Sequence, residues 1–177
     1  MRTTALLTAF SLLLAGCGDP VLDAEIAALP GNAPGVRNGP THRGGEPCTL
    51  CHSGGVGNPS AFSVAGTLYQ KPTNKIPIEG ALIHVTDATG AAHDLTSNCA
   101  GNFYVPATEW QPTFPLFVTV SDAATGTSIR MLSKVGRDSS CASCHSDPAS
   151  ADSPGHVYLI ADPTVPDGTA PALTCGR

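Results

Sequence analysis

The chain has 177 residues, a formal net charge of −5, 19 Gly and 16 Pro. This much Gly and Pro argues against a helical bundle and favours short strands joined by turns. Lys and Arg are scattered singly, so no basic stripe is present that would bind nucleic acid. The 7 Cys and 6 His are numerous for a chain with 13% charged and 5% aromatic residues, and they carry most of the functional information.

The N-terminus has the layout of an export signal. Arg2 begins a short cationic segment, and residues 5–15 are almost wholly apolar. A membrane span needs roughly 20 apolar residues, so we expect residues 1–16 to be cleaved as a signal peptide. The run Leu-Ala-Gly-Cys ending at Cys17 resembles the lipobox of bacterial lipoproteins. This resemblance implies a lipid on Cys17 and, because Gly18 follows, the outer rather than the inner membrane; a plain signal peptide is the alternative.

Residues 17–46 are rich in Gly and Pro and are expected to form a lipid-anchored tether, with a short helix near 21–29. A coil of this length spans on the order of 30 Å. The alternative for its last third is an ordered arm packed on the domain.

Two segments share the rare pattern C-x-x-C-H, which is the attachment sequence of a c-type haem. Two thiols on one turn each form a thioether to a haem vinyl group, and the adjacent His is the proximal ligand of the iron. The sequence therefore predicts two covalently bound haem c groups. The residues that would hold them are Cys48, Cys51 and His52 for the first and Cys141, Cys144 and His145 for the second.

Three other interpretations of these cysteines stay open. Four Cys and two His could form a tetrahedral zinc site, although zinc does not require a His directly after the second Cys. A redox dithiol would follow a strand in a βαβ pattern, which neither motif does. Structural disulfides are the third interpretation.

The remaining cysteines form a natural pair. A lipid on Cys17 and four thioethers leave Cys99 and Cys175. Exported proteins seldom keep two free thiols, so we expect a disulfide that joins the C-terminal tail to the domain. Two separately buried thiols are the alternative.

Between the motifs, turn signals recur at intervals of roughly 10 residues, which favours an all-β fold, a small sandwich. We expect this domain over residues 61–135, flanked by haem loops at 47–60 and 136–177. The expected strands are residues 63–69, 80–86, 91–97, 102–106, 116–122, 128–135 and 156–161.

The runs 64–69, 77–90 and 96–103 resemble the carboxypeptidase regulatory-like domain, which implies a transthyretin-like, non-catalytic β fold. The likeness ends after Phe103, where Trp110 and Phe114 are inserted. The order of lipobox, haem motif, β domain and second haem motif resembles lipoprotein cytochromes of the delta-proteobacterial kind, a resemblance that implies no named activity.

One hairpin places two histidines together. A tight turn at residues 87–90 would set His84 opposite His93. Alternation with the apolar residues would leave both on the outer face, with Cβ atoms about 5 Å apart, where they could reach two neighbouring irons. A slip of one residue would turn one of them inward.

The sixth ligands of the two irons must come from the remaining histidines or Met131. His84 and His93 are the favoured candidates, and His42 and His156 are the alternatives. Because Met131 is the only Met beyond the signal peptide, we expect bis-His ligation at one or both haems.

These patterns favour a lipid-anchored dihaem cytochrome that transfers single electrons in the periplasm or at the cell surface, and not an enzyme. Its partners would be redox proteins such as other cytochromes. A haem enzyme or gas sensor with an open iron site is one alternative. A subunit of a haem-containing filament or matrix, and hence a homo-oligomer, is another.

Overall fold

The computed structural model describes residues 19–54, 60–162, 164–168 and 175. The expected signal peptide and Cys17 therefore lie outside the described residues. The chain divides into two compact units, Met1–Pro30 and Gly31–Arg177. Among the described residues, no helix has the length and apolar character needed to span a membrane.

The first unit contains the expected short helix, α2 (Pro20–Ala28). The Asp19 side chain caps it by accepting hydrogen bonds from the backbone N–H groups of Val21 and Leu22, at 3.1 and 3.2 Å. This Asp cap and a Pro in the first turn are typical of a helix start.

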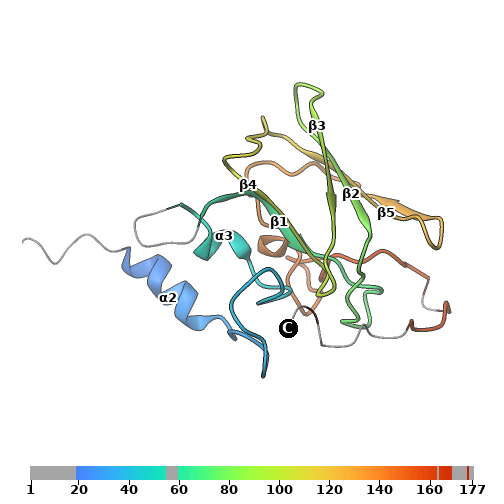
Figure 1. Cartoon of the computed structure of the whole chain (residues 1–177), viewed down its shortest axis with the longest axis horizontal. Coiled ribbons are helices and arrows are strands. Elements are labelled where there is room, and N and C mark those ends of the chain that lie inside the picture. The colour runs from blue at the N-terminus through green and yellow to red at the C-terminus, as the bar shows by residue number, and fades with distance from the viewer. Residues whose placement is uncertain (1–18, 55–59, 163, 169–174, 176–177) are drawn as a thin grey trace, which may run out of the picture. The chain divides into compact units, whose positions relative to one another are not determined.

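The second unit consists of two antiparallel sheets (Figure 1). In the two-stranded sheet, β1 (Phe62–Thr67) pairs with β4 (Asn102–Pro106). The second sheet has the order β3-β2-β5-β6. Its strands are β2 (Leu82–Thr86), β3 (Ala92–Thr96), β5 (Phe117–Asp122) and β6 (Thr127–Arg130). The expected all-β fold is confirmed.

One hydrophobic core contains side chains from both sheets. In β2, Ile83 and Val85 are fully buried while Leu82 and His84 are exposed, the alternation of a half-buried strand. Val105 of β4 and Leu116 and Leu159 of the loops complete the centre of this core.

Six of the seven expected strands are present, and the seventh, 156–161, is not. Tyr158 forms only an isolated bridge to Tyr69, and the pairing ends after Ile160 N donates to Gln70 O at 2.8 Å. Pro72 follows two residues later and has no N–H to extend a ladder. The expected strand at 128–135 is also shorter, because regular pairing stops at Arg130.

The predicted register of the β2–β3 hairpin is wrong by one residue. His84 lies opposite Asp94, and His93 lies opposite Val85. The turn is longer than expected, because Asp87 N bonds to Ala91 O at 2.8 Å and closes a loop with three residues between them. Such a loop favours Gly at its left-handed position, which Gly90 occupies with φ +87°.

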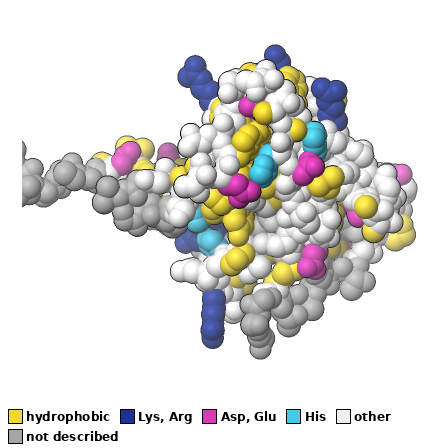
Figure 2. All heavy atoms as spheres, turned by 45° about the horizontal axis from the view of Figure 1, so that its top comes forward, with side chains coloured by type: hydrophobic (Ala, Val, Ile, Leu, Met, Phe, Trp, Pro, Cys, Tyr) yellow, Lys and Arg dark blue, Asp and Glu magenta, His cyan; other side chains and the backbone are white. Residues whose placement is uncertain are grey.

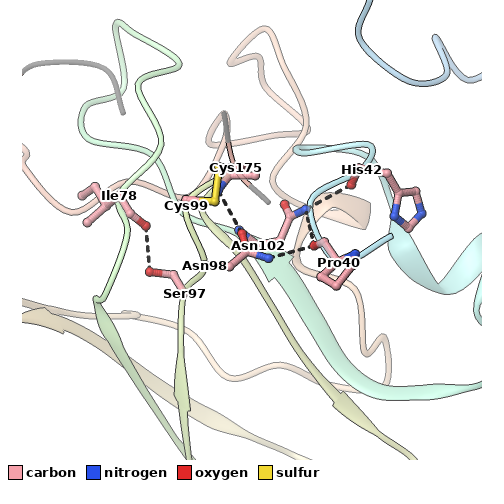
Figure 3. Close-up of a disulfide and its surroundings, with 9 residues drawn as sticks. Pro40, His42, Ile78, Ser97, Asn98, Cys99, Asn102 and Cys175 are labelled. Carbon is pink, nitrogen blue, oxygen red and sulfur yellow. Dashed lines mark hydrogen bonds between the residues drawn. A yellow bond between two sulfur atoms is a disulfide. The ribbon is translucent and has the colours of Figure 1, made fainter. Parts of the chain in front are cut away.

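The expected tether is shorter than residues 17–46, because the chain from Gly31 onward belongs to the compact β unit. Its last third is an ordered arm. Asn102 Nδ2 donates to Pro40 O at 3.2 Å and to His42 O at 3.0 Å (Figure 3). Gly45 N donates to the hydroxyl of Thr67 at 2.8 Å.

Cys99 and Cys175 form the expected disulfide, with Cα atoms 5.6 Å apart (Figure 3). It closes a loop with a sequence separation of 76 residues. The C-terminal tail is thus joined covalently to the turn that precedes β4.

Candidate functional site

The two C-x-x-C-H motifs fold into the same kind of turn. The first forms α3 (Cys48–Cys51), and His52 N donates to Cys48 O at 2.9 Å. The second begins with the 3₁₀ helix η1 (Cys141–Ser143), and His145 N donates to Cys141 O at 2.8 Å. Side chains three apart on a helical turn lie on one face, so each motif presents its two thiols together.

All four motif thiols are free. Burial raises the pKa of Cys48 to about 11. Burial, together with the neighbouring Cys48, raises the pKa of Cys141 to about 12. Redox-active dithiols have lowered pKa values because they react as thiolates. At the raised pKa values, few thiolates form at Cys48 or Cys141 near neutral pH.

Both motifs pack on strand β1 (Figure 1). Ala65 N donates to Ser139 O at 2.8 Å, which holds the chain just before η1 against β1. At Gly66, an added Cβ atom would lie 2.8 Å from Cys141 Sγ. Two segments that are distant in the sequence therefore meet beside one strand, where only a residue without a side chain leaves room.

The two motif histidines share a hydrogen-bond pattern. His52 Nδ1 lies 3.0 Å from Ser60 O, and His145 Nδ1 lies 3.0 Å from Gly155 O. A carbonyl can only accept, so Nδ1 carries the proton and Nε2 keeps its lone pair. This is how metal-ligating histidines are oriented in proteins. The motif residues thus fit a haem: Nε2 of each His would bind the iron, and the two thiols of each motif would form the thioethers.

Aromatic rings cover one side of the first motif. The imidazole of His52 stacks on Phe62 with ring centroids 4.0 Å apart and an interplanar angle of 11°. Phe62 in turn stacks on Tyr104 at 4.6 Å. These contacts fix the orientation of the His52 ring and give it an apolar neighbour.

Among the described residues, no three His, Cys, Asp or Glu side chains converge to form a metal site. A tetrahedral zinc site would need such convergence. A haem iron needs only one or two protein ligands, since the porphyrin supplies the others.

The favoured sixth ligands, His84 and His93, do not lie together. Since the observed register of the β2–β3 hairpin differs from the predicted one by one residue, the side chains of His84 and His93 point to opposite faces of the sheet. His84 is exposed, with Nδ1 2.6 Å from Asp94 Oδ1. His93 stacks on Trp110 at 5.2 Å and lies 3.4 Å from Glu109 Oε1. On the face shown in Figure 2, histidine side chains lie beside acidic ones.

His84 borders a shallow hollow of about 350 Å³ on the outer face of the four-stranded sheet. Thr86, Phe117, Thr119 and Arg130 line the rest of it. None of the motif residues reaches this hollow, so it is separate from the candidate haem sites.

His156 is buried and has both ring nitrogens occupied. Nδ1 lies 2.8 Å from Asp147 Oδ1, and Nε2 lies 2.7 Å from Lys71 O. Tyr69 packs edge-on against the ring at 4.9 Å. Neither nitrogen is free for an iron, so His156 serves in this structure to tie the loop after His145 to the β domain.

His42 alone of the four candidates lies beside a motif histidine. Its ring centroid is 5.9 Å from that of His52, with an interplanar angle of 47°. Its Nδ1 bonds to the carbonyl oxygen of Gly39, the same pattern that both motif histidines show.

The sequence did not indicate the acidic partners of three candidate histidines. These pairs are His84 with Asp94, His93 with Glu109, and His156 with Asp147. Only the correct hairpin register could have revealed the first pair, and no spacing in the chain indicates the other two.

Comparisons of the chain with protein-family models, with curated proteins and with solved structures find no match. The likenesses to the carboxypeptidase regulatory-like domain and to lipoprotein cytochromes therefore stay predictions. The functional interpretation depends on the motifs and on the geometry around them.

Proposed function

We propose that the protein is a dihaem c-type cytochrome that transfers single electrons. The observation that carries this proposal is the equivalence of the two motifs. Each combines free thiols on one turn with a histidine whose Nδ1 is held by a carbonyl oxygen, at 3.0 Å in both cases. Such equivalence is expected where two segments bind the same cofactor.

The bound haems would supply the one-electron chemistry, and the chain would hold, orient and shield them. Cys48, Cys51, Cys141 and Cys144 would form the thioethers. Packing of both motifs on β1 supports close spacing of the two sites. The second motif approaches this strand closely, because a Cβ atom on Gly66 would lie 2.8 Å from Cys141 Sγ. Close spacing favours passage of an electron from one site to the other within the protein.

The proposed cytochrome is exported and anchored to the outer membrane by a lipid on Cys17, where it exchanges electrons with other redox proteins. This part of the proposal depends on the export signal and the lipobox resemblance. The Cys99–Cys175 disulfide supports an oxidising compartment.

The test is haem content after co-expression with a c-type maturation system. We expect two covalent haems per chain by intact mass and by a haemochrome assay. The double variant C48A/C51A should retain one haem, and C141A/C144A should retain the other. The matched control C99A/C175A removes two cysteines outside the motifs and should retain both haems. An exported protein that carries zinc and no haem would overturn the proposal.

A further inference from the structure

We propose that the two haem sites are unlike: His42 is the sixth ligand of the first, and the second is open to a neutral diatomic ligand such as CO. This inference rests on the proposed function, because it requires both haems. It concerns the surroundings of His52 and His145, which are equivalent in their motifs and differ in their neighbours.

The first observation is the placement of His42. Its Nδ1 bonds to the Gly39 carbonyl oxygen, which leaves Nε2 as the basic nitrogen. No hydrogen bond to that Nε2 is present among the residues that the structure describes. The same holds for Nε2 of His52, whose Nδ1 is 3.0 Å from Ser60 O. Two imidazoles with available Nε2 atoms thus lie beside each other.

Their separation suits one iron between them. An imidazole nitrogen binds a metal ion at about 2.0 Å, so two rings that bind one ion from opposite sides have centroids about 6 Å apart. The observed separation of the His42 and His52 centroids is 5.9 Å. The described pairs of neighbouring aromatic and imidazole rings include no second pair of histidines.

Hydrogen bonds to the β domain hold the arm that carries His42. Asn102 Nδ2 donates to His42 O at 3.0 Å, and Thr67 donates its hydroxyl to Asn102 Oδ1 at 2.7 Å. Arg43 and Glu46 form an ion pair at 3.1 Å across the following turn. The ring itself points away from Asn102 (Figure 3). The backbone is anchored while the imidazole is left available.

Among the described residues, His145 of the second site has no histidine beside it that corresponds to His42 at the first site. His156 uses both ring nitrogens, with Asp147 and Lys71. His84 and His93 belong to the β2–β3 hairpin, where His84 pairs with Asp94, while His93 pairs with Glu109 beyond β4.

Met131 is not placed to be the sixth ligand of the second haem iron either. Its backbone N donates to Val118 O at 3.0 Å, so it follows β6 at the edge of the four-stranded sheet. The turn that begins the second motif, η1, packs instead on β1 of the other sheet.

The expected consequence is a functional difference. Two imidazoles saturate a haem iron, whereas an iron with one protein ligand has an open position for small ligands. The first site would then serve electron transfer alone. The second could both accept an electron and bind a diatomic gas.

The experiment is a CO titration of the reduced, fully matured protein, followed by visible spectroscopy, with EPR of the oxidised form. We expect one CO per two haems, together with one low-spin and one high-spin ferric signal. His42→Ala should take up two CO and lose the low-spin signal. The matched control His84→Ala changes an exposed histidine outside both sites and should still take up one CO.

His42→Met tests the identity of the ligand, because it replaces the imidazole with a thioether that can also bind the iron. A His/Met site has a higher reduction potential than a bis-His site, so one of the two potentials should rise while the signal stays low-spin. The inference is overturned if the wild type binds no CO or two CO, or if both potentials are unchanged in His42→Met. A second CO gained by His84→Ala, His93→Ala or Met131→Ala would also overturn it. Failure of the proposed function is distinct, because the haemochrome assay would already have found no haem.

Discussion

Gly66 and Cys141 meet so closely that a Cβ atom on Gly66 would lie 2.8 Å from the sulfur and 2.9 Å from Cys141 Cβ. The same added atom would lie 2.7 Å from the ring of Phe103. A glycine in β1 therefore allows the second motif to pack on the strand against which the first motif also packs. The contact makes the placement of the second motif sensitive to a single methyl group.

Gly66→Ala should displace η1 from β1 and lower attachment of the second haem, while the first haem is retained. Overpacking of this kind costs about 1–3 kcal/mol of stability. Intact mass would count the haems, and thermal unfolding would measure the loss. The control is Gly136→Ala, because nothing lies within 4 Å of a Cβ there. Equal haem content in both variants would contradict the role given to Gly66.

Asn102→Ala should loosen the arm that carries His42. It removes donors to Pro40 O and His42 O and leaves the hydroxyl of Thr67 without its acceptor. Asn102 is buried, so a cost of about 2 kcal/mol is expected in urea unfolding. Limited proteolysis should also cut the arm faster. Gln111→Ala removes one exposed hydrogen bond and should change stability by less than about 0.5 kcal/mol.

Loss of the disulfide should destabilise the domain without removing haem. Cys99 and Cys175 close a loop with a sequence separation of 76 residues. In the chain-entropy treatment, a loop of that size contributes about 4.5 kcal/mol by restricting the unfolded chain. C99S/C175S should therefore unfold at lower urea concentration than the wild type, with two haems still bound. Coincident unfolding curves for the two proteins would contradict this expectation.

The motif thiols of the haem-free chain should alkylate in an order set by burial. The pKa values of Cys48 and Cys141 are raised to about 11 and about 12, so few thiolates form there at pH 8. Cys144 is exposed and should react with iodoacetamide first. Peptide mass spectrometry would measure the order, and fast labelling of Cys141 at pH 8 would contradict it.

The same pKa values predict how the stability of the haem-free chain depends on pH. The thiols deprotonate near pH 8.5 in the unfolded chain, and burial prevents this in the folded chain. The unfolded state therefore loses protons first as the pH rises. The free energy of unfolding of the haem-free chain should decrease from about pH 8.5 up to the raised pKa of about 11 at Cys48. Between about pH 8.5 and about pH 10 it should change little in the haem-bound protein, whose thiols are thioethers; above that, burial of Tyr69, which raises its pKa to about 12, lowers the stability of both forms.

The local features of this protein could be predicted from sequence because short-range chemistry determines them. The C-x-x-C-H motifs form one turn each, since the bond from His52 N to Cys48 O spans four residues. Six strands follow from turn residues and alternation. The Cys99–Cys175 pair is not local, but it follows from the cysteine count, because the lipobox and the two motifs leave only these two cysteines.

What only the tertiary structure decided depends on contacts that no local pattern encodes. Asp87 accepts hydrogen bonds from the backbone of Thr89, Ala91 and Thr113, and the last of these lies far along the chain. The resulting loop is one residue longer than a tight turn, so His84 and His93 face opposite sides of the sheet. A period of two makes strand faces sensitive to such a shift.

The positions of the four candidate ligands were decided in the same way. By itself the sequence determined the chemistry of two C-x-x-C-H motifs on an all-β domain, because those patterns act within a few residues. A long-range hydrogen bond to Lys71 O occupies Nε2 of His156. Another, from Asn102 of β4 to His42 O, holds the arm on the β domain, with His42 beside His52. Such bonds join residues dozens of positions apart, and only the folded chain brings these together.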